Sequence, residues 1–339
     1  MKKIILFFIV SLVTITAGTA LAATNEAAPT CANGQVNCMP IIYLIKNDIT
    51  LNVPGDSPFG FAEHKYLRTI QDALKELTDK KIAPSAVVTI KLTQNPPDKY
   101  STIVVDHPDG DKIHIIGDCD GNSCNLLFEE KTNGLQVSDG NKLGLIDGFY
   151  FIGTADSQDN QFYGIYANDS GVIKTGENMA VQNFYNGIFA DNHSYILANK
   201  IKSTNNAHDG ILASNGSTIT ANNAVTNDNK YCGVHAENSS NIYGDDIQSK
   251  NNSMGVFAAF ASSITIRGSL VAGNSDGGIL ADYNAIISAS GSDASENSHS
   301  SYQATYNAGV ACIRCIAGKV VTTTGGYVCG EFDPKVPSL

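Results

Sequence analysis

The chain has 339 residues, a formal net charge of −11 and 16% charged residues. Such an acidic chain lacks the basic patch that nucleic-acid binding requires, and it suits a neutral partner or an anionic one bridged by a divalent cation. The arginines, Arg68, Arg267 and Arg314, are too few for clusters that bind phosphate or polyuronate groups.

The first 22 residues combine two lysines, an apolar stretch and small residues that end at Ala22. This pattern predicts a secretory signal peptide cut after Ala22, so we expect a secreted or periplasmic protein. No later segment has the length and apolar character needed to span a membrane. Residues 23–65 are predicted to form an N-terminal extension.

Eight cysteines in an exported chain predict disulfides. Two pairs are close enough in sequence to close local loops, Cys31 with Cys38 and Cys119 with Cys124. The "CIRC" segment, Cys312 to Cys315, favours a disulfide over a zinc site in an exported protein. The sequence leaves the full connectivity open.

The segment 66–81, "YLRTIQDALKELTDKK", places Leu67, Ile70, Leu74 and Leu77 on one face of a predicted helix. The alternating runs "VVTIKL", "TIVVD" and "KIHIIG" follow and are typical of strands. An open end of a stacked fold exposes apolar side chains and unpaired backbone. We therefore expect the helix to cap the N-terminal end of such a fold.

A pattern of glycine, isoleucine or valine, any residue and alanine recurs along the chain in steps of 22 or 23 residues. Its copies begin at Gly164, Gly187, Gly210, Gly233, Gly255 and Gly278. An asparagine stands four residues before each glycine, and the series is Asn160, Asn183, Asn206, Asn229, Asn251 and Asn274, continued by Asn297. We interpret these asparagines as structural, with amides that bond to neighbouring repeats.

Each repeat holds three short alternating segments, such as "GILA", "STITA" and "AVT" within residues 210–226. Strands this short cannot bury a core alone, but stacked coils would pair each strand with its counterpart about 4.8 Å away. The sequence therefore predicts an all-β fold, a right-handed parallel β-helix with three-strand coils of about 23 residues. It would occupy residues 66–339, with the amphipathic helix as N-terminal cap and a cysteine-containing C-terminal cap. The branched residues and alanines of the motif should point inward.

The segments "TIQDAL", "VVTIKL" and "IVVDHPDGDKIHIIGD", together with the repeats, resemble pectin-lyase-like β-helix proteins such as pectinesterases and phage tail proteins. The resemblance covers most of residues 66–330 and implies the β-helix fold. It does not imply one activity, because that superfamily hosts lyases, hydrolases, esterases, epimerases and adhesins. The chain lacks the Gly-His-Gly and Arg-Ile-Lys motifs of polygalacturonases, and its "AHDG" at 207–210 is similar to only part of the Asp-Pro-His-Asp motif of mannuronan epimerases.

The third position of the motif should point outward, yet it carries mostly aromatic or leucine side chains. We call this column the stripe, and its members are Tyr166, Phe189, Leu212, His235, Phe257 and Leu280. An exposed apolar stripe predicts an interaction surface, and flat aromatic faces suit sugar rings. The predicted substrate-binding residues are Tyr166, Phe189, Leu212, Phe257, Leu280, Asp191 and Asp282. Alternatively, a terminal segment covers the stripe or the stripe packs in an oligomer.

Ionisable residues gather near the middle of the stripe. His235 and Glu237 lie two apart on one predicted strand, and His208 and Asp209 lie in the turn before Gly210. A histidine beside carboxylates is typical of general acid–base catalysis, so these four residues are the predicted catalytic group. A solvated polar face is the alternative. No metal site is predicted and no cofactor is required, although turn aspartates could bind Ca²⁺.

Two functions follow from these patterns. The first is a secreted β-helix protein that binds polysaccharide or a cell-surface glycan and, if it is an enzyme, acts as a polysaccharide lyase or glycoside hydrolase. The second is a non-catalytic structural or adhesive protein whose stripe mediates assembly or surface attachment. The sequence leaves open whether the chain is an enzyme and whether it forms oligomers.

Overall fold

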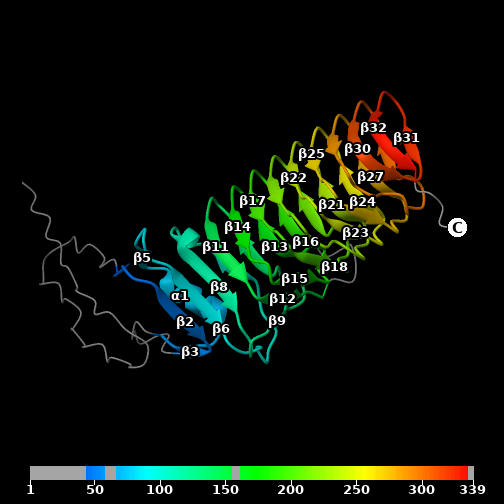
Figure 1. Cartoon of the computed structure of the whole chain (residues 1–339). Coiled ribbons are helices and arrows are strands. Elements are labelled where there is room, and N and C mark those ends of the chain that lie inside the picture. Colours follow the sequence, from blue (N-terminus) through cyan, green and yellow to red (C-terminus); the bar gives the residue numbers. More distant parts are fainter. Residues whose placement is uncertain (1–42, 58–65, 155–160, 335–339) are drawn as a thin grey trace, which may run out of the picture. The chain divides into compact units, whose positions relative to one another are not determined.

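The computed structural model describes residues 43–57, 66–154 and 161–334, and they form short strands wound into stacked coils (Figure 1). The predicted signal peptide and the Cys31 and Cys38 pair lie outside these residues. In the described part of the chain, no helix is long and apolar enough to cross a membrane.

One face of the stack is a parallel sheet of ten strands. In chain order they are β7 (Ile103–Val105), β10 (Leu135–Val137), β13 (Tyr163–Ala167), β16 (Asn186–Ala190), β19 (Ile211–Ala213), β21 (Cys232–Ala236), β24 (Met254–Ala258), β27 (Gly277–Ala281), β29 (Tyr302–Ala304) and β31 (Val320–Thr322). This sheet carries the repeated motif, because Ile165, Ile188 and Ile211 pair in register on β13, β16 and β19. Each paired residue is 23 positions from the next.

A second parallel sheet has twelve strands and includes the second segment of each repeat. Its strands are β2 (Ile49–Val53), β6 (Val88–Leu92), β8 (Ile113–Gly117), β11 (Lys142–Asp147), β14 (Val172–Thr175), β17 (Tyr195–Leu197), β20 (Thr218–Thr220), β22 (Asn241–Tyr243), β25 (Ser263–Thr265), β28 (Ile286–Ser288), β30 (Gly309–Ala317) and β32 (Tyr327–Pro334). Because β2 is its first strand, the stack begins before the predicted boundary at Tyr66. That boundary is wrong, since "ITLNV" alternates and pairs with β6 although it lies in the predicted extension.

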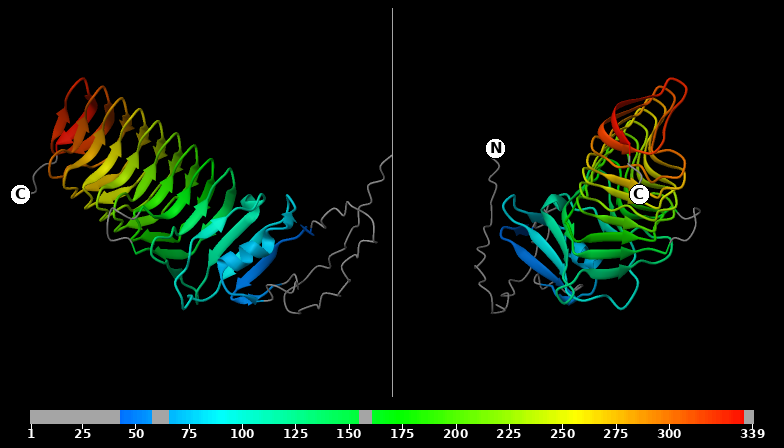
Figure 2. Two further views of the ribbon diagram at one scale, coloured as in Figure 1. Left: turned by 180° about the vertical axis from the view of Figure 1, so that it is seen from behind. Right: turned by 45° about the vertical axis from the view of Figure 1, so that its right-hand side comes forward.

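The third face is formed by shorter strands. They are β9 (Cys124–Leu127), β12 (Phe149–Ile152), β15 (Met179–Gln182) and β18 (Lys202–Thr204), followed by the pair β23 (Gln248–Lys250) and β26 (Leu270–Ala272). Single bridges through Val225 connect β18 to β23. Figure 2 shows the three faces repeating along the stack, which makes the fold a parallel β-helix.

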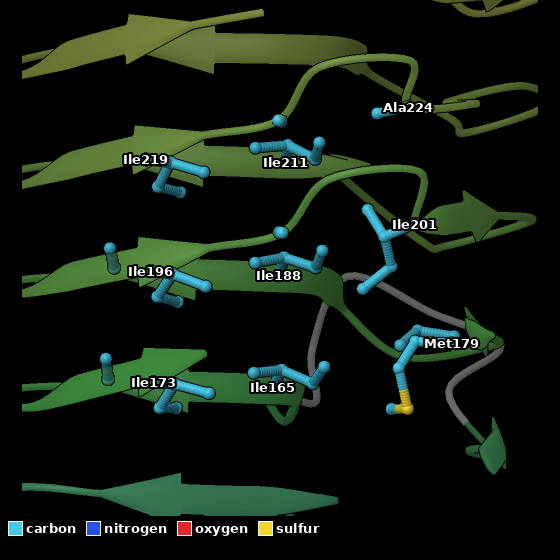
Figure 3. Close-up of a cluster of buried hydrophobic side chains, with 14 of the residues drawn as sticks. Ile165, Ile173, Met179, Ile188, Ile196, Ile201, Ile211, Ile219 and Ala224 are labelled. Carbon is cyan, nitrogen blue, oxygen red and sulfur yellow. The ribbon is translucent and has the colours of Figure 1, made fainter. Parts of the chain in front are cut away.

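Aligned branched side chains fill the interior. Ile165, Ile188 and Ile211 form one column and Ile173, Ile196 and Ile219 the facing one (Figure 3), and all six are fully buried. The motif alanines form a second inward column on the ten-stranded sheet, with Ala167, Ala190, Ala213, Ala236 and Ala258 also fully buried. The predicted inward positions are therefore confirmed.

The asparagines form a buried ladder that joins successive coils. The Asn206 backbone N–H donates to Asn229 Oδ1 at 3.0 Å, and Asn229 N–H donates to Asn252 Oδ1 at 2.9 Å. Asn274 and Asn297 continue this pattern. The structural interpretation is confirmed for Asn206, Asn229, Asn274 and Asn297.

Two of the predicted asparagines are one position out of register. Asn252, and not Asn251, stands in the ladder, because the coil that ends at Gly255 is one residue shorter. In the coil before Asn206, Phe184 takes the ladder position. Its ring is buried, and its backbone N–H donates to Asn206 Oδ1. Asn183 and Asn251 lie one residue earlier with φ of 59° and 57°, a conformation that asparagine tolerates.

Helix α1 (Ile70–Leu77) is shorter than the predicted 66–81 segment. It begins at Thr69, whose side chain and that of Asp72 form a reciprocal capping box. The flanking residues are strands instead: β4 (Tyr66–Leu67) pairs with β3 (Gly55–Asp56), and β5 (Lys80–Ile82) pairs with β1 (Tyr43–Ile45). A 3₁₀ turn, η1 (Gly110–Lys112), precedes β8.

The helix also provides hydrogen-bond partners for the backbone of the first strand of the ten-stranded sheet. The Gln71 amide donates to Val104 O at 3.3 Å and accepts from Val104 N–H at 2.9 Å. Both groups belong to β7, which has no neighbouring strand on that side among the residues that the structure describes. Gln71 thus replaces a further strand at this edge.

Candidate functional site

The stripe is not an exposed surface, contrary to the prediction. Phe189, Leu212 and His235 at its centre are only 9%, 7% and 6% exposed, while Tyr166, Phe257 and Leu280 are half-buried. Side chains of the same coils cover it: the Tyr163 ring lies 4.8 Å from the rings of both Tyr166 and Phe189. Phe189 and Leu212 therefore offer little accessible surface to a glycan.

A neighbouring column of rings lies nearer the solvent. Tyr185, His208 and Tyr231 each stand three residues before the buried branched residue of their coil, and all three are half-buried. The His208 ring is stacked on Tyr185 with centroids 4.9 Å apart, and the Tyr231 ring lies 4.6 Å away on the other side. The two tyrosines thus hold the imidazole between them.

Beneath His208 lies the fully buried carboxylate of Asp209. Its Oδ2 is 2.9 Å from His208 Nδ1 and 3.2 Å from His235 Nδ1, one coil away. Its Oδ1 accepts the Cys232 backbone N–H at 3.0 Å. Asp209 therefore joins the two predicted histidines, and its acceptor role places a proton on Nδ1 of each. The free Nε2 of His208 then carries the lone pair.

Glu237 completes the group from the same strand as His235. Its Oε2 is 4.0 Å from His235 Nε2, an atom that is buried and has no hydrogen-bond partner within the described part of the chain. Its other oxygen accepts from Ser214 Oγ at 3.0 Å. The structure thus brings together His208, Asp209, His235 and Glu237, which we call the His–Asp cluster.

Burial and charge set the protonation of this cluster. Burial alone would raise the pKa of Asp209, but the imidazoles of His235 and His208 outweigh it and hold that pKa well below its ordinary value. Burial would lower the pKa of His235, yet Asp209 and Glu237 raise it. Burial also raises the pKa of Tyr231 and of Tyr185, so both phenols remain protonated at neutral pH.

The remaining predicted substrate contacts are separate from the cluster. Asp191 and Asp282 occupy the column of Glu237 but lie two coils to either side of it. Asp191 accepts from the Asn215 amide at 2.7 Å, and Asp282 accepts from the Thr305 hydroxyl. Neither carboxylate reaches His208 or His235 by hydrogen bonding.

Residues 186–320 match a family model described as the right-handed beta helix region. The parallel sheets and the repeat register agree with that match. The chain has the fold of a right-handed parallel β-helix. No curated protein matches the chain.

Sequence reasoning missed Cys232 as a member of the site. Two disulfides of this β-helix protein close local loops, Cys119 with Cys124 as predicted and Cys312 with Cys315. Cys232 is fully buried and forms no disulfide with any cysteine that the structure describes, and burial together with Asp209 raises the pKa of its thiol. Cys232 stands two residues before Val234, just as Asp209 stands two residues before Ile211. Aligning the two coils could therefore have identified Cys232 as a neighbour of Asp209.

Asp209, Cys232 and His235 offer oxygen, sulfur and nitrogen atoms within 4.8 Å of one another, a donor set that could hold a transition metal ion. Asp209 already engages both partners through hydrogen bonds. The three side chains therefore form a hydrogen-bonded group.

Proposed function

We propose that this β-helix protein binds polysaccharide and acts on it by proton transfer at His208. The observation that carries the proposal is the buried Asp209 carboxylate, which accepts from His208 Nδ1 and leaves Nε2 as the basic atom. The His208 side chain is 23% exposed, whereas His235 is 7% exposed. His208 is thus the member of the pair that a substrate can reach, and His235 supports Asp209.

The chemistry best suited to this arrangement is that of a lyase. His208 Nε2 would take the proton from the carbon next to a uronate carboxyl group, a carbon–carbon double bond would form, and the bond to the glycosidic oxygen would break. The hydroxyl of Tyr185 or Tyr231 would donate the proton that the leaving oxygen needs. A divalent cation such as Ca²⁺ could neutralise the uronate carboxylate, because the chain itself is acidic.

A glycoside hydrolase is less well supported. Such enzymes require two carboxyl groups that flank the scissile bond. Asp209 is fully buried, and Glu237, with a side chain 30% exposed, is the one cluster carboxylate that solvent reaches. The cluster therefore lacks the second accessible carboxylate.

The test is turnover of acidic and neutral polysaccharides, with and without Ca²⁺, followed by absorbance of unsaturated ends and by release of reducing ends. Replacing His208 by Gln should lower the rate about 100-fold or more. His193→Asn is the matched control, because His193 lies exposed in a turn with a φ of 63° that asparagine tolerates. Equal activity of His208→Gln and the wild type would refute the proposal. Reducing ends without unsaturated ends would replace the lyase by a hydrolase.

A second candidate is a non-catalytic adhesive or structural role, which one exposed feature favours. Phe260, Tyr283 and Tyr306 are 50%, 43% and 45% exposed, and their rings stack in successive coils with centroids 5.1 and 4.6 Å apart. This role predicts no turnover of any polysaccharide, and loss of self-association in Tyr283→Asn measured by analytical ultracentrifugation.

A further inference from the structure

A groove of about 560 Å³ lies on the third face of the β-helix, on a different sheet from the His–Asp cluster. Its floor is the outward column of β9, β12, β15 and β18, in which Asn125, Tyr150, Ala180 and Lys202 pair in register. The volume falls in the range of saccharide-sized ligand sites.

The hollow arises because the floor residue between Tyr150 and Lys202 is an alanine. Strand alternation points Ala180 outward, while its neighbours Met179 and Val181 are buried. A small side chain between a phenol ring and a long lysine leaves room for a bound molecule. The half-buried Tyr150 ring provides an apolar surface beside that space.

Short turns hold the wall of the groove in place. Asn178 donates its backbone N–H to Asp147 Oδ1 at 2.8 Å and its amide to Asp147 Oδ2 at 3.3 Å. Ser123 Oγ donates to Asn178 O at 3.5 Å, and the disulfide between Cys119 and Cys124 closes the loop that carries Ser123. A wall fixed before binding lowers the entropy cost of association.

The charged side chains of the groove favour an anionic ligand over a cationic one. Two of its lining residues are charged, Glu177 and Lys202. Glu177 is neutralised by Lys200, whose Nζ lies 2.6 Å from its Oε2. Lys202 forms no ion pair within the residues that the structure describes, and its ammonium can donate to a carboxylate. The Asn125 amide offers both a donor and an acceptor for hydroxyl groups.

We propose that this groove is a second saccharide-binding site that holds a uronate residue of an acidic polysaccharide. The sugar ring packs on Tyr150, its carboxylate pairs with Lys202, and Asn125 bonds to its hydroxyl groups. The site performs no chemistry, and it does not depend on proton transfer at His208. It would hold an acidic polymer on the face beside the cluster and raise its local concentration there.

The experiment is isothermal titration calorimetry of the full mature protein with oligomers of galacturonate, mannuronate and guluronate, and with cello-oligosaccharide as the neutral probe. The His208→Gln background prevents turnover, and its binding should equal that of the wild type if the groove is separate. Tyr150→Ala should weaken the uronate probe about tenfold or more. Lys202→Gln should weaken binding of the uronate probe and leave binding of the neutral probe unchanged. Tyr243→Ala is the matched control, because Tyr243 is 47% exposed on the twelve-stranded sheet.

A filling variant provides an independent measurement that removes no binding group. Ala180→Phe adds an outward ring to the floor of the groove and should abolish binding while thermal unfolding stays unchanged. Three results would overturn the proposal: no uronate binding below about 10 mM, unchanged affinity in both Tyr150→Ala and Ala180→Phe, or equal weakening in Tyr243→Ala. Loss of turnover in His208→Gln with intact uronate binding would separate the groove from the catalytic proposal.

Discussion

The asparagine ladder provides a sharp test of how the coils are joined, because Asn251 and Asn252 are adjacent in sequence and only Asn252 lies in the ladder. Asn252 is 3% exposed, and its Oδ1 accepts the backbone N–H of Asn229 at 2.9 Å. Its amide donates to Thr226 O at 3.0 Å and to Ser249 Oγ at 3.1 Å. Replacing Asn252 by Ala removes these bonds, together with those between its side chain and the side chains of Asn229 and Asn274, and leaves the buried backbone N–H of Asn229 without an acceptor.

The expected cost follows from these contacts. An orphaned buried donor costs about 1–3 kcal/mol, and each of the two lost donor bonds costs about 0.5–1.5 kcal/mol more. Asn252→Ala should therefore lower the free energy of unfolding by about 2–6 kcal/mol. Equilibrium urea unfolding measures this cost, and amide hydrogen exchange at Asn229 should show where the protection is lost.

The control is the preceding residue. Asn251 is exposed and has a φ of 57°, a conformation that glycine adopts without strain, and Gly273 already stands at the same position one coil later. Asn251→Gly should cost less than about 1 kcal/mol. If the two variants were equally stable, the ladder would not contribute to stability as argued, and the register of the coils at Gly255 would need revision.

The other predictions concern the stripe and the cluster. Leu212→Ala should cost about 2–4 kcal/mol in urea unfolding and leave glycan affinity unchanged, because Leu212 is buried. The pKa of Asp209 is lowered in the folded protein, so this group stabilises the fold above pH 3.8, and the stabilisation is lost as the pH falls toward the lowered pKa. The pKa of His235 is raised, so this group stabilises the fold below pH 6.5, and the stabilisation is lost as the pH rises through the raised pKa. Melting temperatures should therefore fall on both sides of that window, and Asp209→Asn should flatten both limbs and cost about 2–4 kcal/mol within it. EDTA should leave the melting temperature unchanged, because hydrogen bonds already engage Asp209, Cys232 and His235; a lower value in EDTA would reveal a bound metal ion.

The repeat register made much of the fold predictable. Identical positions in successive coils pair in parallel, so the inward branched residues and alanines could be assigned from the sequence alone. The asparagine shift was not visible, because an asparagine stands four residues before the glycine in every coil, and Asn252 directly follows Asn251. Only the hydrogen bonds show which of Asn251 and Asn252 enters the core.

The exposure of the stripe could not be predicted in the same way. Alternation predicts which side of a strand a residue occupies, but it does not say what lies over that side. The ring of Tyr163 comes from the first residue of its strand and that of Tyr231 from the turn just before its strand, and they approach Phe189 and His235 from neighbouring positions. Outward and exposed are therefore different properties in a coil whose turns carry large side chains.

The same geometry explains why the His–Asp cluster could be named from the sequence although its contacts could not. In a parallel stack, each position contacts the equivalent positions one coil away. A group of polar residues therefore requires only two neighbouring coils whose residues differ from those at the same positions in the other coils. The column of Asp209 holds Asn186 before it and Cys232 after it, then Met254 and Gly277. Isoleucine or valine fills the adjacent inward column from Ile165 to Ile279, so the two coils from His208 to Glu237 can carry distinctive chemistry without disturbing the core that supports them. The cluster is thus a local exception on a regular support, which is where a β-helix can acquire a function without changing its fold.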